Sequence, residues 1–357
     1  MTAGYALGLP PAAIGNPHAV PAEQDMILAV RRDVPGYSET AFLTSWNPHQ
    51  NIGLFLHMGR CQQDLDMWWA QILVYLPDGR IAAQREYGRG PSDNSHVRAG
   101  GFALEMHGRR GHWSCRYDGA AEITTPATMA EHPVGSGIAR PVRFELHTEP
   151  RGPIWDMYTA LGKPPGAQGW AQGTHIQQVL HLRGQITVDG TEYNLDGTAA
   201  NDHSSGPRSI SDFGHHHFLT GAYPGGTLQC MSVFSMTGQP LMQTGSHVTD
   251  GAHHTKAHLI DVPIIDRTSD TSGAFTATLV QADGSTVPID IEILHTAPVS
   301  ATEAGDNING IPCDGPDLLA ITEYRVRFTL PEGVVGYAHL ERSTQRSRLL
   351  QARATDR

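Results

Sequence analysis

The chain has 357 residues, a formal net charge of −11 and a sequence pI of about 5.9, a balance that argues against nucleic acid or an anionic membrane as a partner. Hydrophobic residues make up 39% of the sequence, which is too many for a disordered chain, and no run of eighteen apolar residues predicts a membrane span. Four widely spaced cysteines without a CxxC pair exclude a disulfide scaffold and a zinc ribbon. The N-terminus lacks the pattern of a signal peptide, so we expect a cytoplasmic protein.

Length predicts two domains. Residues 1–24 are rich in Ala, Pro and Gly and are expected to form an irregular arm on the surface. The loop 162–169 contains two prolines and three glycines and suggests a boundary near residue 170. We therefore expect an N-terminal domain over 25–170 and a C-terminal domain over 171–357.

Alternation with a period of two dominates the rest of the chain and predicts β-strands. It is clear in Val142–His147, in residues 287–294 and in Tyr324–Leu330, where Arg325 and Arg327 are expected to face water. The strand Leu180–Val188, the turn Asp189-Gly190 and the strand 191–195 form the clearest predicted hairpin. Short helices are expected only at Ser38–Thr44 and Glu341–Gln351. The fold class is all-β, of barrels or sandwiches, and a duplicated barrel fits both halves.

Familiar catalytic motifs are absent. The sequence contains no Walker A loop, no GxGxxG after a strand, no HExxH and no GxSxG, so nucleotide hydrolysis, dinucleotide chemistry and serine hydrolysis lack support. No cofactor is expected.

Histidine is abundant, and a tandem triple occurs at residues 215–217. On a strand, His215 and His217 share a face and offer ligands for one metal, with His254 and His258 as distant partners. No acidic ligand stands beside them at a motif spacing. We therefore favour imidazoles at the surface or lining a pocket, and predict no metal site.

The segment 201–208, Asn-Asp-His-Ser-Ser-Gly-Pro-Arg, follows the predicted hairpin. Asp202 and His203 are expected near a strand end at a barrel mouth, where a polar group faces an apolar pocket. A poorly solvated carboxyl group keeps its proton near neutral pH, and His203 and Arg208 would set its orientation. The alternative is that Asp202 caps a turn and pairs with Arg208.

Aromatic residues form a second group of candidates. Their rings either fill a core or present π faces that stabilise a transient carbocation. The group comprises Trp68, Trp69, Trp113, Trp155, Trp170, Tyr87, Tyr117, Tyr158 and Phe213.

The stretch 181–190, with Tyr193, Asp196-Gly197 and the segment 202–208, resembles the superfamily of carotenoid 1,2-hydratase (hydroxyneurosporene synthase) and its AttH-like relatives, including kievitone hydratase. Residues 69–80 are also similar to its N-terminal half. The resemblance implies two consecutive lipocalin-like antiparallel β-barrels, a hydrophobic cavity and an apolar, often prenylated or polyene, substrate. The chemistries of the group include addition of water to an isolated C=C bond and ring closure. This chain has Ser205 where the family usually has Trp, so part of the pocket differs.

These observations lead to the hypothesis of a cofactor-independent, acid-catalysed enzyme acting on the C=C bond of an apolar terpenoid, prenylated or polyene compound by hydration, dehydration, isomerisation or cyclisation. By match to the motif, Asp202 is the predicted proton donor and His203 its neighbour. The predicted substrate-binding residues are Trp68, Trp69, Trp170, His181, Arg208 and Phe213. A non-catalytic carrier of a hydrophobic ligand and a His-dependent metalloenzyme are the alternatives, and the sequence leaves the oligomeric state open.

Overall fold

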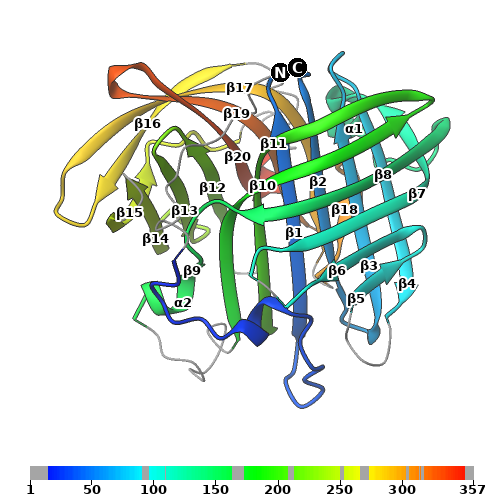
Figure 1. Ribbon diagram of the computed structural model, residues 1–357, viewed down its shortest axis with the longest axis horizontal. Coiled ribbons are helices and arrows are strands. Elements are labelled where there is room, and N and C mark those ends of the chain that lie inside the picture. Colours follow the sequence, from blue (N-terminus) through cyan, green and yellow to red (C-terminus); the bar gives the residue numbers. More distant parts are fainter. Residues whose placement is uncertain are drawn as a thin grey trace.

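The computed structural model describes residues 15–90, 96–108, 110–162, 173–207, 213–249, 253–265, 273–302, 305–312, 314 and 317–349. The predicted all-β class is confirmed: two closed antiparallel barrels of eight strands follow one another along the chain. Figure 1 shows the first barrel on the right and the second on the left. None of the helices in these ranges is long and apolar enough to cross a membrane.

The first barrel closes through pairing of β4 with β7, in the order β4-β3-β2-β1-β11-β10-β8-β7. Short strands β5, β6 and β9 extend this sheet, and a 3-10 helix (Ala22–Asp25), α1 (Pro126–Glu131) and α2 (Met157–Ala160) accompany it. Its strands are β1 (Tyr37–Asn47), β2 (Ile52–Cys61), β3 (Asp64–Tyr75), β4 (Ile81–Arg89), β5 (His96–Ala99), β6 (Phe102–Met106), β7 (Trp113–Thr124), β8 (Ala139–Pro150), β9 (Trp155–Asp156), β10 (Thr174–Val188) and β11 (Thr191–Pro207).

The second barrel closes through pairing of β16 with β17, in the order β16-β15-β14-β13-β12-β20-β19-β17. The short strand β18 pairs with β17, and a 3-10 turn (Pro331–Gly333) joins β19 to β20. Its strands are β12 (His215–Tyr223), β13 (Gly226–Phe234), β14 (Pro240–Thr249), β15 (His253–Ile260), β16 (Ala274–Gln281), β17 (Thr286–Ala301), β18 (Asn307–Asn309), β19 (Leu319–Leu330) and β20 (Val334–Gln345).

The hairpin of β10 and β11 is confirmed, with Asp189 at φ 48° and Gly190 at φ 79° in its turn. Because β11 also pairs with β1 along its length, this hairpin completes the first barrel. The change from the first sheet to the second falls between Pro207 and His215, later than the boundary near residue 170 that the loop suggests. Of the arm expected over 1–24, residues 15–24 are described, and Val20 is buried with Ile154 and Ile176.

Both expected helices are corrected by the structure. Residues 38–44 lie within β1, where Leu43 faces the barrel core and Phe42 faces the second barrel. Since both faces are buried, the run lacks the alternation of polarity that marks a half-exposed strand. Of the helix expected over Glu341–Gln351, residues 341–345 belong to β20 and residues 346–349 are helical.

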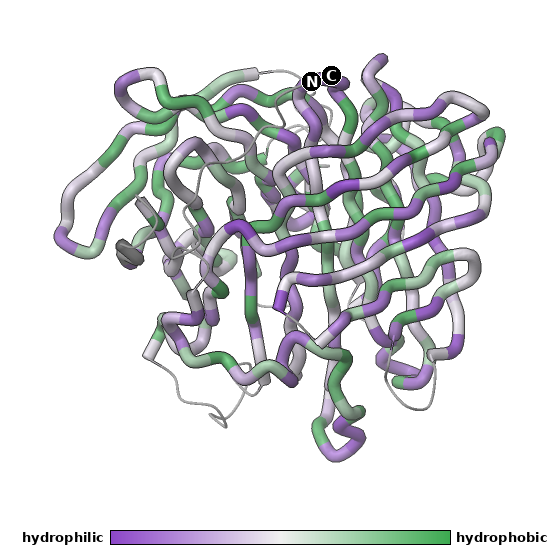
Figure 2. The backbone as a smooth tube through the Cα atoms, viewed as in Figure 1, coloured by the Kyte–Doolittle hydropathy of each residue, from purple (hydrophilic) through white to green (hydrophobic). Residues whose placement is uncertain are grey.

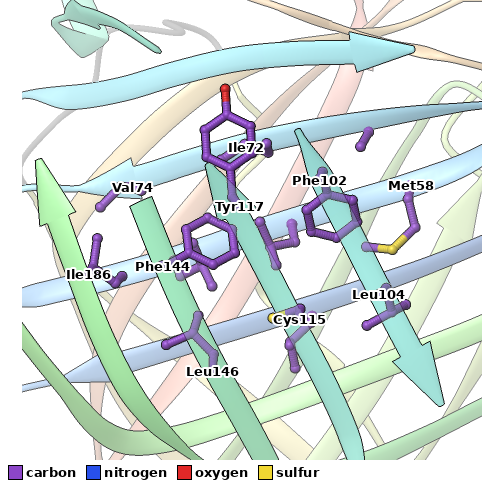
Figure 3. Close-up of a cluster of buried hydrophobic side chains, with 14 of the residues drawn as sticks. Met58, Ile72, Val74, Phe102, Leu104, Cys115, Tyr117, Phe144, Leu146 and Ile186 are labelled. Carbon is purple, nitrogen blue, oxygen red and sulfur yellow. The ribbon is translucent and has the colours of Figure 1, made fainter. Parts of the chain in front are cut away.

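Each barrel has its own core, and a third cluster lies between them. Figure 3 shows aliphatic and aromatic side chains filling the first barrel, among them Phe102, Tyr117 and Phe144. Figure 2 shows the alternation of hydrophobic and hydrophilic residues along the strands that builds these cores. The third cluster joins Phe42 and Phe55 of the first barrel to Phe218 of the second. The outer faces of β1, β2, β12, β19 and β20 are therefore buried.

Candidate functional site between the barrels

A row of side chains from the first barrel faces the second. Residues directly opposite on neighbouring antiparallel strands share a face of the sheet. The register places Gln177, Asp202, Phe42, His57 and Gln71 in one such row across β10, β11, β1, β2 and β3. All of these residues except His57 are buried.

A matching row from the second barrel faces the first. It runs through Met231, Phe218, Glu341, Glu323 and Ala297 on β13, β12, β20, β19 and β17. The rings of Phe42 and Phe218 lie 5.9 Å apart, edge to face, so the two rows meet. Aromatic rings and two carboxyl groups thus share one buried space.

Glu323 and Glu341 are directly opposite each other on β19 and β20. Glu323 is 0% exposed, and among the described residues neither of its oxygens accepts a hydrogen bond. Glu341 instead pairs closely with Nε2 of His216, whose Nδ1 lies 2.5 Å from Ser343 Oγ. The two carboxyl groups therefore have very different surroundings.

These surroundings separate the acidities of the pair. Burial, reinforced by the negative charge of Glu341, raises the pKa of Glu323 well above its ordinary value. Burial also opposes ionisation of Glu341, but the charge and hydrogen bond of His216 outweigh it and hold the pKa of Glu341 below its ordinary value. A hydrogen bond between the two carboxyl groups acts in the same sense, so the proton is favoured on Glu323 over Glu341.

His339 is the base nearest to Glu323. Its Nε2 lies 3.1 Å from Glu323 Oε2, and its ring is stacked on Phe55 with the centroids 5.4 Å apart. Neither ring nitrogen has an aligned hydrogen-bond partner among the described residues. Burial and the nearby Arg325 guanidinium hold the pKa of His339 well below its ordinary value, so the imidazole is neutral. A protonated acid and a neutral base are therefore in contact.

Glu323, His339 and Glu341 each offer a ligand atom, and these atoms lie within 4.8 Å of one another. Two carboxylates and one imidazole are a plausible donor set for a divalent metal. However, the guanidinium of Arg325 already places a positive charge beside Glu323 and His339. We therefore interpret the cluster as an acid–base pair and derive no metal chemistry from it.

The histidine triple is divided between two faces of β12. His216 faces the first barrel, whereas His217 lies on the other face and contacts the carbonyl oxygen of Leu259 at 3.2 Å. His215 stacks on Phe234 with the ring centroids 4.4 Å apart. The side chain of His254 lies outside the described residues.

Asp202 faces the space between the barrels, next to Phe42 in the row. Its Oδ2 lies 2.5 Å from His175 Nε2 and accepts a hydrogen bond of 3.1 Å from Gln177 Nε2. His203 follows it on the strand and therefore points to the opposite face. The structure thus places Asp202 with His175 and Gln177, and not with His203.

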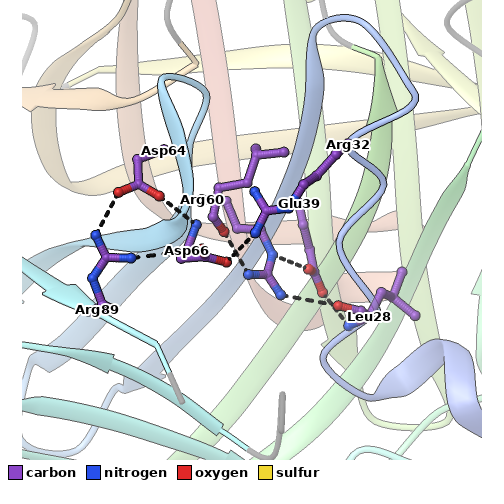
Figure 4. A network of polar contacts seen from close by, with 8 residues as sticks. Leu28, Arg32, Glu39, Arg60, Asp64, Asp66 and Arg89 are labelled. Atoms are coloured by element: carbon purple, nitrogen blue, oxygen red, sulfur yellow. Dashed lines mark hydrogen bonds and ion pairs between the residues drawn. The ribbon is translucent and has the colours of Figure 1, made fainter. Parts of the chain in front are cut away.

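His203 belongs to a buried charge network at one end of the first barrel. Glu39 accepts from the Arg60 guanidinium at 2.8 Å and lies 3.0 Å from His203 Nε2. The backbone of Leu28 joins Glu39 and Arg60, as Figure 4 shows, and His203 Nδ1 donates to the carbonyl oxygen of Gln24. The geometry explains His203 as a group that fixes the segment 24–28 across the barrel end.

The predicted substrate-binding residues separate into three groups. Trp69 lies at the inter-barrel site, with its ring 5.0 Å from His57, and Phe213 lies at its edge, 6.4 Å from His216. Trp68 points into the first barrel core under Arg60, and His181 pairs with the half-exposed Asp196 on the outside. Trp170 and Arg208 lie outside the described residues.

The acid–base groups of this site were not predicted from the sequence. Glu323 and Arg325 fall on alternate positions of β19. We expected Arg325 to face water, yet it is 1% exposed, and Glu323 was not singled out by its sequence pattern. The companion expectation for Arg327 is correct, because it pairs with the exposed Glu292. The signal in the sequence is the pair His339 and Glu341 on alternate residues of β20.

A family model matches residues 24–346, nearly the whole described chain. The chain belongs to the family described as domain of unknown function DUF7064. No curated protein matches the sequence. The sequence of this DUF7064 protein therefore establishes a family but no activity.

Solved structures share the fold of this DUF7064 protein. The AttH protein of Nitrosomonas europaea has a TM-score of 0.62 at 14% identity, over 93% of this chain and 99% of that chain. CghA with Sch210972 has a TM-score of 0.51 at 13% identity, over 87% and 89%. Kievitone hydratase from Nectria haematococca has a TM-score of 0.51 at 10% identity, over 93% and 95%. The expected AttH-like, two-barrel fold is confirmed.

Proposed function

We propose that this DUF7064 protein is a cofactor-independent enzyme that protonates the C=C bond of an apolar small molecule between its two barrels. The proposal rests mainly on one observation: Glu323 is a fully buried carboxyl group among aromatic rings, and it lies 3.1 Å from the neutral imidazole of His339. Neighbouring groups whose environments drive their acidities apart are the pattern of acid–base catalysis.

The reaction follows from these two groups. The O–H of Glu323 gives its proton to one alkene carbon, the π electrons form the new C–H bond, and the other carbon becomes cationic. The faces of Phe42, Phe55 and Phe218 stabilise a cation, and the two carboxylates offset its charge. His339 then accepts a proton, either from an adjacent carbon or from water added to the cation, and returns it to Glu323. Catalyst and charge are restored.

The fold relatives support a small-molecule substrate. One is a hydratase by name, and another is described with a bound small molecule, Sch210972. Their identity to this chain is low, and the proposed chemistry depends on Glu323 and His339. Hydration, dehydration and isomerisation all fit the acid–base pair.

Asp202 was the proton donor predicted from the sequence, and we now assign that role to Glu323. Asp202 already has His175 at 2.5 Å and an amide donor from Gln177, whereas Glu323 accepts no hydrogen bond among the described residues. Asp202 with His175 then serves to orient groups at the far side of Phe42.

Glu323→Gln tests the proposal. The variant keeps the shape and the neutral state of the side chain but removes the acidic proton. We expect turnover of prenyl, terpenoid or polyene substrates, followed by mass spectrometry and by deuterium incorporation from D2O, to fall by about 100-fold or more. Turnover is expected to fall less in Asp202→Asn than in Glu323→Gln.

Glu292→Gln is the matched control, because Glu292 is an exposed glutamate of the same barrel paired with Arg327. It should retain full turnover. His339→Gln provides a second test that leaves both carboxyl groups in place, and it should also be impaired. Full turnover by a folded Glu323→Gln protein, checked by circular dichroism, removes Glu323 from the mechanism.

A further inference from the structure

A small cavity lies between the barrels beside the acid–base pair. Its volume is about 10 Å³, which is about what a single water molecule needs. The first barrel contributes Ser45 and Trp46 to its lining, and the second contributes Thr220, Arg325 and His339. The cavity therefore exists only where the two barrels meet.

Three of the residues of the second barrel that line it form one cross-strand row. Thr220 on β12 is opposite His339 on β20, and His339 is opposite Arg325 on β19. All three are at most 2% exposed. Arg325 is held in place from across the interface, because its guanidinium donates to Thr44 and Tyr75 of the first barrel.

Polar atoms around this cavity lack protein partners. Among the described residues, Thr220 Oγ1, Arg325 Nε and both ring nitrogens of His339 have no aligned hydrogen-bond partner, and the same holds for Trp46 Nε1. Leaving such groups buried and unsatisfied is unfavourable. A gathering of unsatisfied donors and acceptors around a space of this size is the signature of a bound polar ligand.

We propose that this cavity binds one water molecule, held by Thr220, Arg325 and His339, and that this water is the nucleophile of the reaction. Arg325 Nε–H is a donor to the water oxygen, and Thr220 Oγ1 and a ring nitrogen of His339 are acceptors for its hydrogens. These partners use one lone pair and both hydrogens of the water, so the second lone pair of the oxygen is free to form the C–O bond. The proposal rests on the proposed function and names its reaction as addition or removal of water.

The cycle balances on groups already in contact. After Glu323 protonates the alkene, the water oxygen forms a C–O bond with the cationic carbon, and its proton passes to His339. His339 returns this proton to Glu323, whose Oε2 lies 3.1 Å away. The products are an alcohol and the original enzyme. The reverse sequence removes water from a tertiary alcohol.

Thr220→Val tests the water site, since it replaces a hydroxyl by a methyl of similar size. Thr322→Val is the matched control: Thr322 is 0% exposed and its hydroxyl also lacks a partner, yet it does not line the cavity. The first measurement is a high-resolution crystal structure of the full chain. We expect an ordered water bonded to Thr220, Arg325 and His339, lost in Thr220→Val and retained in Thr322→Val.

The second measurement is the product distribution in H2¹⁸O. We expect the wild type and Thr322→Val to incorporate ¹⁸O into an alcohol. Thr220→Val should lower the ratio of alcohol to isomerised alkene about tenfold, with little change in KM, because one hydrogen bond to the water is lost.

The outcomes separate the two proposals. A wild-type cavity without water overturns the water site whether or not the enzyme turns over. An ordered water with an unchanged product ratio in Thr220→Val overturns its role as nucleophile. If the water is present but no alkene or alcohol reacts in the wild type, the proposed function fails while the binding site stands.

Discussion

Three buried or partly buried carboxyl groups face the space between the barrels, and their partners give each a different chemistry. Asp202 has an imidazole and an amide at hydrogen-bond distance, Glu341 has His216, and Glu323 has no hydrogen-bond donor among the described residues. Burial disfavours the anion of Glu323 and outweighs the nearby charge of Arg325, whereas the charge and hydrogen bond of His216 favour the anion of Glu341. Environment, and not residue type, selects the acid.

Asp25 gives a prediction at the scale of one residue. Burial raises the pKa of Asp25 from 3.8 to about 6, against the favourable backbone N–H of Gly111 and the charges of His203 and Arg110. Between pH 3.8 and about 6 the folded protein binds more protons than the unfolded chain, so stability falls as pH rises through this window. Above it, the full penalty of roughly 3 kcal/mol remains.

Asp25→Asn cannot ionise and still accepts from Gly111. At pH 7 we expect its free energy of unfolding to exceed that of the wild type by up to about 3 kcal/mol, so that it unfolds at a higher urea concentration. Near pH 4 the two proteins should be equally stable. Urea titrations at several pH values measure this difference. If the variant is more stable than the wild type by the same amount at every pH, the raised pKa of Asp25 is not the cause.

At the scale of elements, strand alternation explains both the successes and the failures of site prediction. Asp202 and His203 are neighbours in sequence, but a strand sends them to opposite faces, one to the interface and one to the barrel end. Likewise, the tandem histidines of β12 serve two different environments. Adjacent residues of a sequence motif on a strand therefore face two different environments and do not form one site.

Gly184 of β10 lies where the neighbouring strand comes very close to it, so its substitution tests how tightly the sheet is packed. It has φ 153° and pairs with Leu146 of β8 and Leu195 of β11. A Cβ there would lie 2.1 Å from the carbonyl oxygen of Glu145. We expect Gly184→Ala to lower the free energy of unfolding by about 2 kcal/mol or more.

Gly238→Ala is the control for conformational strain alone, since Gly238 has φ 79° with no atom near its absent Cβ. It should lose only about 1 kcal/mol. Thermal denaturation of the two variants gives the comparison. Equal losses would show that β8 and β10 separate without penalty.

At the scale of the whole molecule, the cluster between the barrels should make them unfold together. Phe42, Phe55 and Phe218 pack in one cluster that includes residues of both barrels. All six tryptophans lie at or before residue 170, so tryptophan fluorescence reports on the first barrel, whereas circular dichroism reports on both.

Phe218→Ala is a change in the second barrel whose effect should appear in the first. We expect urea unfolding followed by fluorescence and by circular dichroism to coincide in the wild type. Phe218→Ala should lower stability by about 3–5 kcal/mol in both signals. A fluorescence transition unmoved by this substitution would mean that the barrels are independent.

The sequence by itself determined the all-β class, the hairpin of β10 and β11 and the two-barrel resemblance. These depend on local alternation, on the positive φ of Asp189-Gly190 and on a motif read along the chain. It also drew attention to Asp202 and Trp69, which do face the inter-barrel space.

Only the tertiary structure decided which outer faces are covered. Alternation divides a strand into two faces but says nothing of what packs on the second, so Arg325 was expected in water and lies buried against Thr44 and Tyr75. The pairing of Glu323 with His339 depends on β19 lying beside β20 and on the first barrel excluding water from both. Burial by a distant part of the chain creates the acid, and no local pattern encodes that burial.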